Sequence, residues 1–542
     1  MQIERKHYII GILIGVAYFI FLASQLSQYG MTWDESLYFS SGLSYVNYFQ
    51  GSPLTVGNIS NSANYGPFVD ILSTYTYMFF GKITNLMDPI AAHRLPIAFL
   101  AALAVCAVYF FVLRNHNMWT AILSAIFTGF FPRFFAHAHF NAKDIPIAGL
   151  FVVCLFVFYE ATFKKKWWLS ISAGILLGIS FAVKFNAVFI PVILLIWWIV
   201  LFEANFKKIF YFFKNRIDLL VAFIIAVPSS IAVWPWLWHD TINGIIGIFH
   251  HFLTVGKGFS VFYYGKAYVS GTNVPWHYPY GYLLVVTPLL ILVLAGIGIF
   301  FAAKNIRSHK SESPDMHPTI YTFYSLILIW FVIVTIKVSI SGMVYDGIRQ
   351  FFEAVPAIGI LAGFGFWIII KTIHSFYKKM QLPSLTIIVL VCVLLLYLPT
   401  IITLTKLHPY ESSYFNELVG GTQGAVGKFR ISYWGEPIKY GIEWLNQNAA
   451  TGSSINVIEA PHIAKYYIRK DLRLVQGNGG DYIVTLNAFP VRPIYTISVD
   501  SVPILNIYKG NTAPNLTAYP DEDDLELFYK QEFVNLKESK NE

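Results

Sequence analysis

Long apolar stretches alternate with short polar ones up to about residue 405. A helix of about 20 apolar residues spans a hydrocarbon core about 30 Å thick. Stretches of this kind begin near residues 8, 94, 118, 145, 167, 186, 217, 282, 319, 350 and 384. The pattern predicts a polytopic α-helical membrane protein with about eleven transmembrane helices, of which the first is retained at the N-terminus.

The pattern changes after residue 405. Four short segments alternate apolar and polar side chains as strands do, and the sequence that starts at Pro437 has the spacing of an amphipathic helix. The strand-like segments are SINVIEA (454–460), YIVTLNAF (482–489), YTISVD (495–500) and PILNIYK (503–509). We therefore expect two domains, a transmembrane domain over residues 1–405 and a soluble α+β domain over residues 406–542.

Composition agrees with a membrane protein, and the basic residues predict its orientation. The 542 residues are 56% hydrophobic and 13% charged, with a mean hydropathy of +0.56. The net charge of +8 does not indicate nucleic-acid binding, because lysine and arginine gather in short loops between apolar stretches. Alternating the predicted helices puts the clusters at 5–6, 164–166 and 207–216 on one side, which the positive-inside rule makes cytoplasmic. The C-terminus then lies on the opposite, extracytoplasmic side.

The predicted outer loop from residue 30 to 93 holds the first candidate for chemistry. Asp34 and Glu35 follow Trp33 directly after the first predicted helix. A carboxylate at the membrane surface can act as a general base if partial burial tunes its pKa, although two neighbouring acids can equally be a solvated part of a loop. Residues 67–87 have helical spacing, which predicts an interfacial helix that could line a site facing the lipid.

A second group of polar residues lies at the outer junction of the third and fourth predicted helices. Ionisable groups at this depth are costly and are candidates for function; they are Arg133, His137, His139, Lys143 and Asp144. In the structural alternative, Lys143 neutralises Asp144 while Arg133 snorkels to the interface. The two histidines could ligate a metal only with further ligands, and the HExxH spacing is missing, so a divalent metal is left open but is not predicted.

Two arginines at the outer ends of predicted helices could each bind a phosphate through two hydrogen bonds. They are Arg94 and Arg349, and for Arg349 an ion pair with Asp346 is the structural alternative. Tyr65 and Tyr278 are candidate substrate contacts on the same side, and Tyr278 also fits an interfacial aromatic belt.

The motif Trp33-Asp34-Glu35, the interfacial helix, Arg94 and Asp144 together resemble the C-type glycosyltransferase superfamily. Over residues 1–400 the chain is similar to the group of protein O-mannosyltransferases and aminoarabinose transferases. The segments 274–279, 346–350, 408–421 and 433–435 also look like those of prokaryotic members. The loop from 239 to 281 is too short for the inserted domain of the eukaryotic enzymes, so a protein acceptor is not implied.

The resemblance implies a polyprenyl-phosphate-dependent glycosyltransferase in a prokaryotic plasma membrane. It would move a sugar, with inversion, to a hydroxyl of an extracytoplasmic glycan, lipid or protein. Asp34 would be the base, with Glu35 as second choice, and Asp144 would orient a substrate. Arg94 would hold the donor phosphate, with Lys143, Arg133 and Arg349 as weaker candidates, and the possible substrate contacts would be His137, His139, Tyr65 and Tyr278.

Two other functions fit a membrane protein with outer basic groups. One is a transporter or flippase of lipid-linked sugars, and the other is a non-catalytic subunit of polysaccharide assembly. No internal repeat of the kind found in transporters is visible, and the charged residues gather at one membrane face. P-loop and GxGxxG patterns are missing from the sequence, and no cofactor is predicted.

Overall fold

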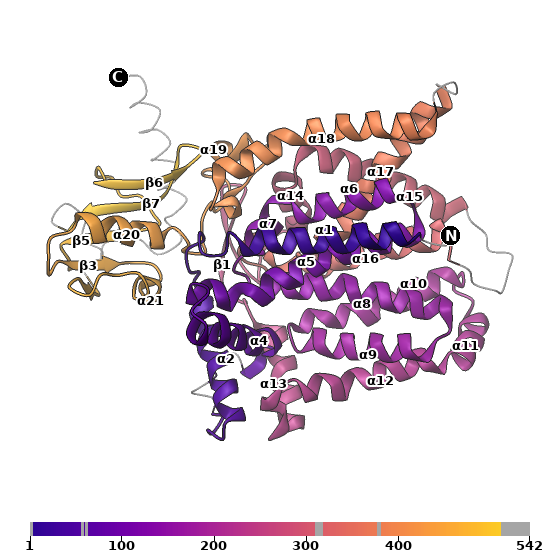
Figure 1. Ribbon diagram of the computed structural model, residues 1–542, viewed down its shortest axis with the longest axis horizontal. Helices are drawn as coiled ribbons and strands as arrows, with labels where there is room; N and C mark the ends of the chain where they lie inside the picture. Colours follow the sequence, from indigo (N-terminus) through magenta and orange to yellow (C-terminus); the bar gives the residue numbers. More distant parts are fainter. Residues whose placement is uncertain are drawn as a thin grey trace.

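The structure, a computed structural model, describes residues 4–55, 59, 63–308, 318–376, 381–477 and 479–510. The described residues form a bundle of roughly parallel helices with a small β-sheet domain at one end (Figure 1). This arrangement agrees with the helical membrane protein and the C-terminal α+β region predicted from the sequence.

Among the described residues, six helices are long and apolar enough to cross a membrane. They are α1 (Arg5–Ala23), α5 (Pro89–Asn115), α8 (Asp144–Lys164), α16 (Ile320–Ser341), α17 (Ala354–Phe376) and α18 (Leu382–Leu407). A seventh span results if the segment made of η3 (Phe185–Val188) and α10 (Phe189–Leu201) is joined across a bend of 118° to α11 (Phe206–Asn215). Shorter apolar helices are α6 (Met118–Gly129), α9 (Trp167–Phe181), α12 (Ile217–Ala232) and the part Leu289–Lys304 of α15 (Leu289–Ser308). The number of eleven spans stays a prediction.

Small residues let the helices of the bundle approach closely, as is usual between membrane helices. A Cβ atom on Gly298 of α15 would lie 2.0 Å from the carbonyl oxygen of Leu361 on α17. A Cβ atom on Gly365 of α17 would lie 1.9 Å from the carbonyl oxygen of Leu294 on α15. Only glycine fits at either position, so sequence here fixes the distance between two helices.

The predicted outer loops contain helices of their own. The first loop folds into α2 (Glu35–Phe49) and α4 (Phe68–Thr76), and α4 continues as the π-helix η2 (Tyr77–Ile83). The helix predicted over residues 67–87 is therefore present. The loop from 239 to 281 holds α13 (Thr241–Thr254) and an antiparallel hairpin of β1 (Ser260–Tyr263) and β2 (Lys266–Val269).

Short helices connect the long ones at the end of the bundle that carries the sheet. They are α7 (Pro132–His137), η4 (Pro235–Trp238), α14 (Tyr278–Val286), η5 (Arg349–Phe351), η6 (Glu411–Ser413) and α19 (Gly421–Ala425). Asp88 shows how the sequence starts a helix at this end. Its side chain accepts hydrogen bonds from the backbone N–H groups of Ile90 and Ala91, and Pro89 occupies the first position of α5.

The C-terminal sheet has five strands in the order β4-β3-β5-β7-β6. β4, β3 and β5 run parallel, whereas β7 is antiparallel to both β5 and β6. The elements are α20 (Ile438–Asn448), β3 (Ser454–Val457), α21 (Pro461–Ala464), β4 (Arg473–Val475), β5 (Tyr482–Thr485), β6 (Tyr495–Val499) and β7 (Val502–Lys509). The four predicted strands and the helix after Pro437 are confirmed, and β4 was not predicted.

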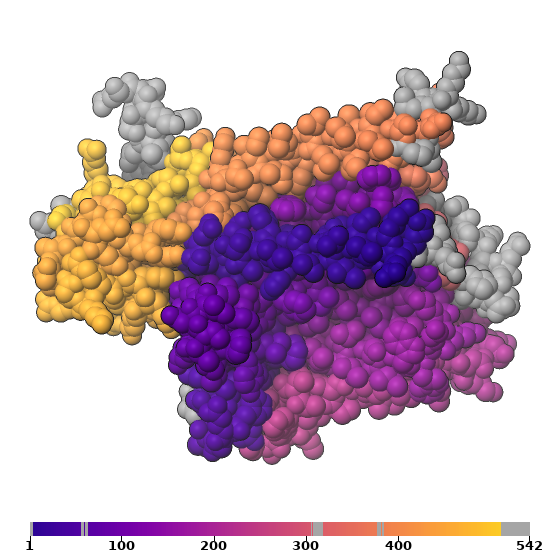
Figure 2. Space-filling model, viewed as in Figure 1, coloured from indigo at the N-terminus to yellow at the C-terminus, as the bar shows by residue number. Residues whose placement is uncertain are grey.

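The sheet domain covers one end of the bundle, while the first described residues and α11 lie at the opposite end (Figures 1 and 2). α1 and α18 run along the flank, where α18 leaves most of its apolar side chains exposed, as a helix facing lipid would. The basic clusters at 164–166 and 207–216 thus lie away from the sheet. Which end faces the cytoplasm stays a prediction from these clusters.

Candidate active site

A cavity of about 540 Å³ lies at the end of the bundle that faces the sheet domain. Five parts of the chain that are far apart in sequence supply its charged groups. These groups are Asp34 before α2, Lys143 and Asp144 at the start of α8, Lys184 before η3, Asp346 and Arg349 around η5, and Arg430 in the segment that leads to the sheet. The cavity therefore exists only when the bundle and the C-terminal segment are both folded.

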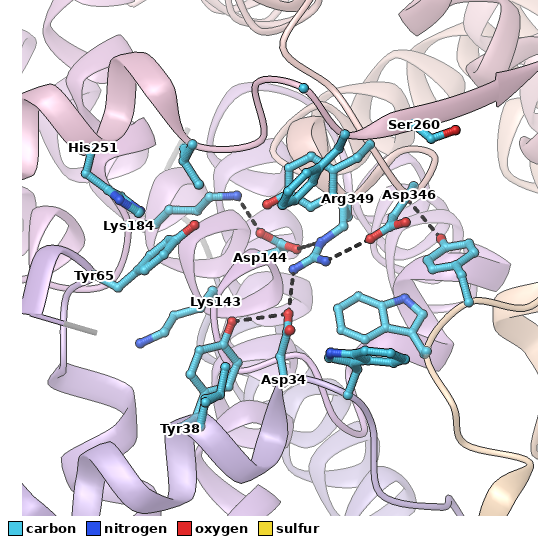
Figure 3. Close-up of a pocket in the computed structure, with 18 of the residues that line it drawn as sticks. Asp34, Tyr38, Tyr65, Lys143, Asp144, Lys184, His251, Ser260, Asp346 and Arg349 are labelled. Carbon is cyan, nitrogen blue, oxygen red and sulfur yellow. Dashed lines mark hydrogen bonds and ion pairs between the residues drawn. The ribbon is translucent and has the colours of Figure 1, made fainter. Parts of the chain in front are cut away.

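Arg349 is the centre of the charged network in the cavity. Its Nη2 donates to Asp34 Oδ2 at 3.0 Å, its Nε to Asp144 Oδ2 at 3.1 Å and its Nη1 to Asp346 Oδ2 at 3.1 Å. The guanidinium also lies 4.3 Å from the ring centroid of Trp434. Figure 3 shows the three carboxylates around Arg349, with Lys184 beyond Asp144. One cation thus fixes three carboxylates that come from three different segments.

Asp34 keeps part of its carboxylate available in the cavity. Its side chain is 25% exposed, against 1% for that of Asp144. Asp34 Oδ2 accepts from Arg349 and, at 3.5 Å, from the hydroxyl of Tyr38. Oδ1 accepts no hydrogen bond from any residue that the structure describes. This oxygen is therefore available for a proton of a bound molecule.

Both carboxylate oxygens of Asp144 accept hydrogen bonds, in contrast to those of Asp34. Its Oδ1 accepts from Lys184 Nζ at 2.5 Å, and its Oδ2 accepts from Arg349 and from Asn141 Nδ2 at 2.9 Å. Lys184 Nζ also donates to Gln350 Oε1 at 3.3 Å. The Asp144 side chain therefore acts as an anchor that places two cations at the floor of the cavity.

Asp346 and Gly347 form a turn in the left-handed region, with φ of 55° and 70°. A residue other than glycine adopts this region only when its surroundings hold it there. The hydroxyl of Tyr433 donates to the carbonyl oxygen of Asp346 at 3.0 Å, and that of Tyr278 donates to the carbonyl oxygen of Gly347 at 3.3 Å. Arg133 Nη1 donates to the Tyr433 hydroxyl at 3.3 Å. Arg133 and Tyr278 thus support the turn before Arg349.

Arg94 and Glu35 form a buried ion pair and do not line the cavity. Arg94 Nε and Nη2 donate to the two Glu35 oxygens at 2.6 and 2.7 Å, and both side chains are less than 5% exposed. The remaining N–H groups of Arg94 donate to the carbonyl oxygens of Leu26, Tyr29 and Gly30. This guanidinium has its full set of partners, so the geometry does not favour the phosphate contact expected from the sequence.

Lys143 pairs with Asp70 of α4 and not with its neighbour Asp144. Its Nζ donates to both Asp70 oxygens at 2.8 and 2.9 Å and to the carbonyl oxygen of Gly66 at 2.7 Å. Burial raises the pKa of Asp70 to about 6, while the Lys143 ammonium acts in the opposite direction. Lys143 therefore joins α8 to α4, and the alternative pairing of Lys143 with Asp144 is wrong.

His137 and His139, which come from the same segment, contact different residues. His137 Nδ1 lies 2.9 Å from Asn141 Nδ2, whereas His139 stacks on Tyr29 with ring centroids 4.1 Å apart. No group of three or more metal-ligating side chains occurs within the described part of the chain. Tyr65 does line the cavity, next to His251.

Residues 71–236 match the family model "Dolichyl-phosphate-mannose-protein mannosyltransferase". ArnT from Cupriavidus metallidurans bound to undecaprenyl phosphate matches 94% of this chain and 99% of its own, at 14% identity and a TM-score of 0.50. For ArnT in the apo state these values are 93%, 98%, 14% and 0.51. The apo oligosaccharyltransferase of Archaeoglobus fulgidus matches 86% of this chain and 59% of its own, at 14% identity and a TM-score of 0.47. No curated protein sequence matches.

The fold is that of a C-type glycosyltransferase. The resemblance to the C-type glycosyltransferase superfamily that was predicted from the sequence is thereby confirmed. At this level of identity the ArnT structures support the fold alone, and the family model covers less than half of the chain.

Several residues that line this cavity were not singled out from the sequence. Lys184 lies in the short turn between two apolar stretches, where a lysine at the end of a pair of apolar helices could have been noticed. Tyr38 follows Asp34 by one helical turn, a spacing that also could have been noticed. Arg430 stands in a loop without any local pattern, so only the fold brings it to the cavity.

Glu436 gives a testable pH dependence next to this site. It is 1% exposed, its Oε1 accepts from Ser412 Oγ at 2.5 Å, and its Oε2 has no partner among the described residues. Burial raises its pKa to about 6. A raised folded-state pKa means that this proton stabilises the fold fully below about pH 4.5, and the contribution is lost as the pH rises through 6.

We therefore expect Glu436→Gln to be more stable than the parent at about pH 8, by up to about 2 kcal/mol. The amide carries no charge that burial could penalise, and the advantage disappears near pH 4.5 because the parent is then protonated. Thermal unfolding of both proteins across this pH range measures the effect. Equal differences at both ends of the range would contradict the assignment.

Proposed function

We propose that the chain is an integral membrane glycosyltransferase that moves one sugar from a polyprenyl-phosphate donor to a hydroxyl group of an extracytoplasmic acceptor. The observation that carries the proposal is the cavity in which Asp34, with one free carboxylate oxygen, lies beside a network of cations at the end of the bundle. The name of the matching family model and the undecaprenyl phosphate bound to ArnT support a lipid-phosphate donor.

Asp34 Oδ1 accepts the proton of the acceptor hydroxyl in this mechanism. The acceptor oxygen attacks the anomeric carbon, the bond between that carbon and the phosphate oxygen breaks, and the lipid phosphate leaves with the bonding electrons. Attack opposite to the leaving group inverts the anomeric centre. Arg349 holds Asp34 Oδ2 at 3.0 Å, so the carboxylate keeps one orientation during the proton transfer.

Arg430 is the best candidate to bind the donor phosphate. It lines the cavity, is partly exposed, and makes no hydrogen bond or ion pair within the ranges that the structure describes. A free guanidinium can take a phosphate through two hydrogen bonds. Lys184 is the second cation that lines the cavity with part of its side chain exposed. Positive charge at this place stabilises the phosphate as negative charge develops on it.

The remaining basic residues receive other roles in this proposal. Arg94 and Glu35 hold the chain before α2, Lys143 holds Asp70, and Arg133 supports Tyr433. Arg349 orients the carboxylates, and its contact with the phosphate is not required. The chain therefore needs fewer phosphate ligands than the four expected from the sequence.

Arg430→Ala is expected to weaken donor binding about tenfold or more while the protein stays folded. Loss of one charge-assisted hydrogen-bond donor corresponds to roughly 1.5–3 kcal/mol. Binding of a radiolabelled polyprenyl-phosphate sugar to protein in lipid nanodiscs measures the effect. Lys428→Ala is the matched control, because Lys428 is an exposed cation two residues away that does not line the cavity. Equal affinity of both variants would exclude Arg430 as the phosphate ligand.

The function itself is tested with a panel of radiolabelled polyprenyl-phosphate sugars. Purified protein in lipid is incubated with each donor and with membranes of the host as a source of acceptor. Transfer of the radiolabelled sugar from one donor to a new product would support the proposal and identify the sugar. Binding of a donor without any cleavage would point to a flippase or to a subunit of polysaccharide assembly.

A further inference from the structure

The backbone of residues 26–33 runs in an irregular path between α1 and α2 and ends next to Asp34. An irregular segment has no ladder of backbone hydrogen bonds, so its polar groups need other partners. Each of the eight residues nonetheless has at least one backbone group in a hydrogen bond, with partners on both sides of the segment. We call this stretch the 26–33 segment.

The bundle side of the 26–33 segment is held by one ion pair. Arg94 donates to the carbonyl oxygens of Leu26, Tyr29 and Gly30 at 2.7 to 2.9 Å. Glu35 Oε2 accepts from the backbone N–H of Thr32 at 2.7 Å. The other four residues of the segment have their hydrogen-bond partners outside this ion pair; they are Ser27, Gln28, Met31 and Trp33.

The C-terminal region supplies the other side. α20 contributes Lys439 and Tyr440, which donate to the carbonyl oxygens of Ser27 at 2.7 Å and Gln28 at 2.5 Å. A Cβ atom on Gly30 would lie 2.0 Å from the carbonyl oxygen of Glu436, so the two backbones touch there. The sheet domain therefore lies directly against the 26–33 segment.

The C-terminal region also makes hydrogen bonds with the residues directly before Asp34. The hydroxyl of Tyr467 accepts from the backbone N–H of Met31 at 2.9 Å. The backbone N–H of Trp33 donates to the carbonyl oxygen of Trp434 at 2.8 Å, and His462 Nε2 donates to the carbonyl oxygen of Trp33 at 3.0 Å. The residue immediately before Asp34 is thus fixed at both of its backbone polar groups by the C-terminal region.

We infer that the C-terminal sheet domain is a positioning element for Asp34, and that Tyr467 and His462 are its positioning residues. The inference rests on the proposed function of Asp34 as the base. A side chain that abstracts a proton must stay within a few tenths of an ångström of its productive place, and supporting hydrogen bonds provide this. Neither Tyr467 nor His462 lines the cavity, so they act on Asp34 only through the 26–33 segment.

The test compares a double variant, Tyr467→Phe with His462→Ala, with the parent in the full-length protein in lipid. Three quantities are measured well below the unfolding midpoint of each protein: kcat for sugar transfer, Kd for the radiolabelled polyprenyl-phosphate donor, and amide hydrogen exchange of peptides from residues 26–38. Lys465→Ala is the matched control, because Lys465 is exposed and makes no hydrogen bond or ion pair with the 26–33 segment, all of which the structure describes.

We expect kcat of the double variant to fall about tenfold or more, because a misplacement of about 1 Å can cost a hundredfold. The Kd for the donor stays within twofold of the parent value. Amide hydrogen exchange of the 26–38 peptides becomes faster, while the rest of the chain exchanges at the same rate as in the Lys465→Ala control. A second double variant, Tyr467→Phe with His462→Gln, regains part of the rate, because the amide can donate to the Trp33 carbonyl. If the two residues only stabilised the fold, the double variant would have a lower folded fraction. Glutamine at position 462 would then not restore the rate, and hydrogen exchange would not change selectively in the 26–38 peptides.

If the parent transfers sugar, unchanged kcat and unchanged hydrogen exchange in the double variant would overturn the inference. If the parent transfers no sugar, the proposed function fails, and the exchange measurement still decides whether the sheet domain fixes the 26–33 segment. Unchanged exchange would then overturn the inference as well.

Discussion

We expect Asp34→Asn to lower the rate of sugar transfer by about a thousandfold. A positioned general base contributes about 10²–10⁴ to a rate, and the amide of asparagine cannot accept the proton of the acceptor hydroxyl at the relevant step. The amide oxygen can still accept from Arg349, so the network around the guanidinium is retained. Initial rates with saturating donor and acceptor, measured on protein of verified fold, give the effect.

Donor affinity serves as the internal control for Asp34→Asn. Arg430 and Lys184 are unchanged in this variant, so the Kd for the polyprenyl-phosphate sugar is expected to stay within a few-fold of the parent value. A variant that keeps more than about a tenth of the parental rate would show that Asp34 is not the base. Asp144 would then be tested next, although its two oxygens are already bound to Lys184, Arg349 and Asn141.

Arg94→Ala lowers the free energy of unfolding by about 3–5 kcal/mol, because it leaves Glu35 buried without its partner. Glu35 is 3% exposed, and the three backbone carbonyl groups bound by Arg94 lose their donor as well. Denaturation of the purified protein in detergent, followed by tryptophan fluorescence, measures the loss. Arg492→Ala is the matched control, since this exposed arginine is expected to change stability by less than about 0.5 kcal/mol.

The same variant separates the two roles that Arg94 could have. A structural role lowers stability and yield while the folded fraction binds the donor with parental affinity. A role in phosphate binding would leave stability unchanged and raise the donor Kd. The second result would restore the expectation drawn from the sequence and contradict the assignment of Arg94 to the 26–33 segment.

Much of the fold could be predicted because its signals are local. Apolar stretches of helical length, the helix after residue 67 and the alternation in residues 482–509 each reflect burial in their own neighbourhood. The strand β4 (Arg473–Val475) has only three residues and lacks such a pattern, so it could not be predicted. Hydrophobic periodicity also does not reveal that α11 turns by 118° away from α10.

The candidate site could be predicted only in part, because its pairings are tertiary. Asp34, Asp144 and Arg349 were identified as ionisable groups at a membrane edge, and all three meet in the cavity. Their partners could not be identified in the same way. Lys143 binds Asp70, which is 73 positions away, in preference to the adjacent Asp144, and Arg430 reaches the cavity only through the fold of the C-terminal region.

Cleavage of a polyprenyl-phosphate sugar in the cavity around Asp34 is the step on which the proposed function depends. Single-turnover cleavage and equilibrium binding of one radiolabelled donor are measured side by side on the parent and on Asp34→Asn, with acceptor present. We expect both proteins to bind the donor with similar affinity and only the parent to transfer the label. A parent that binds the donor but never cleaves it would contradict the proposed function, and an Asp34→Asn variant that cleaves it at the parental rate would contradict the role of Asp34.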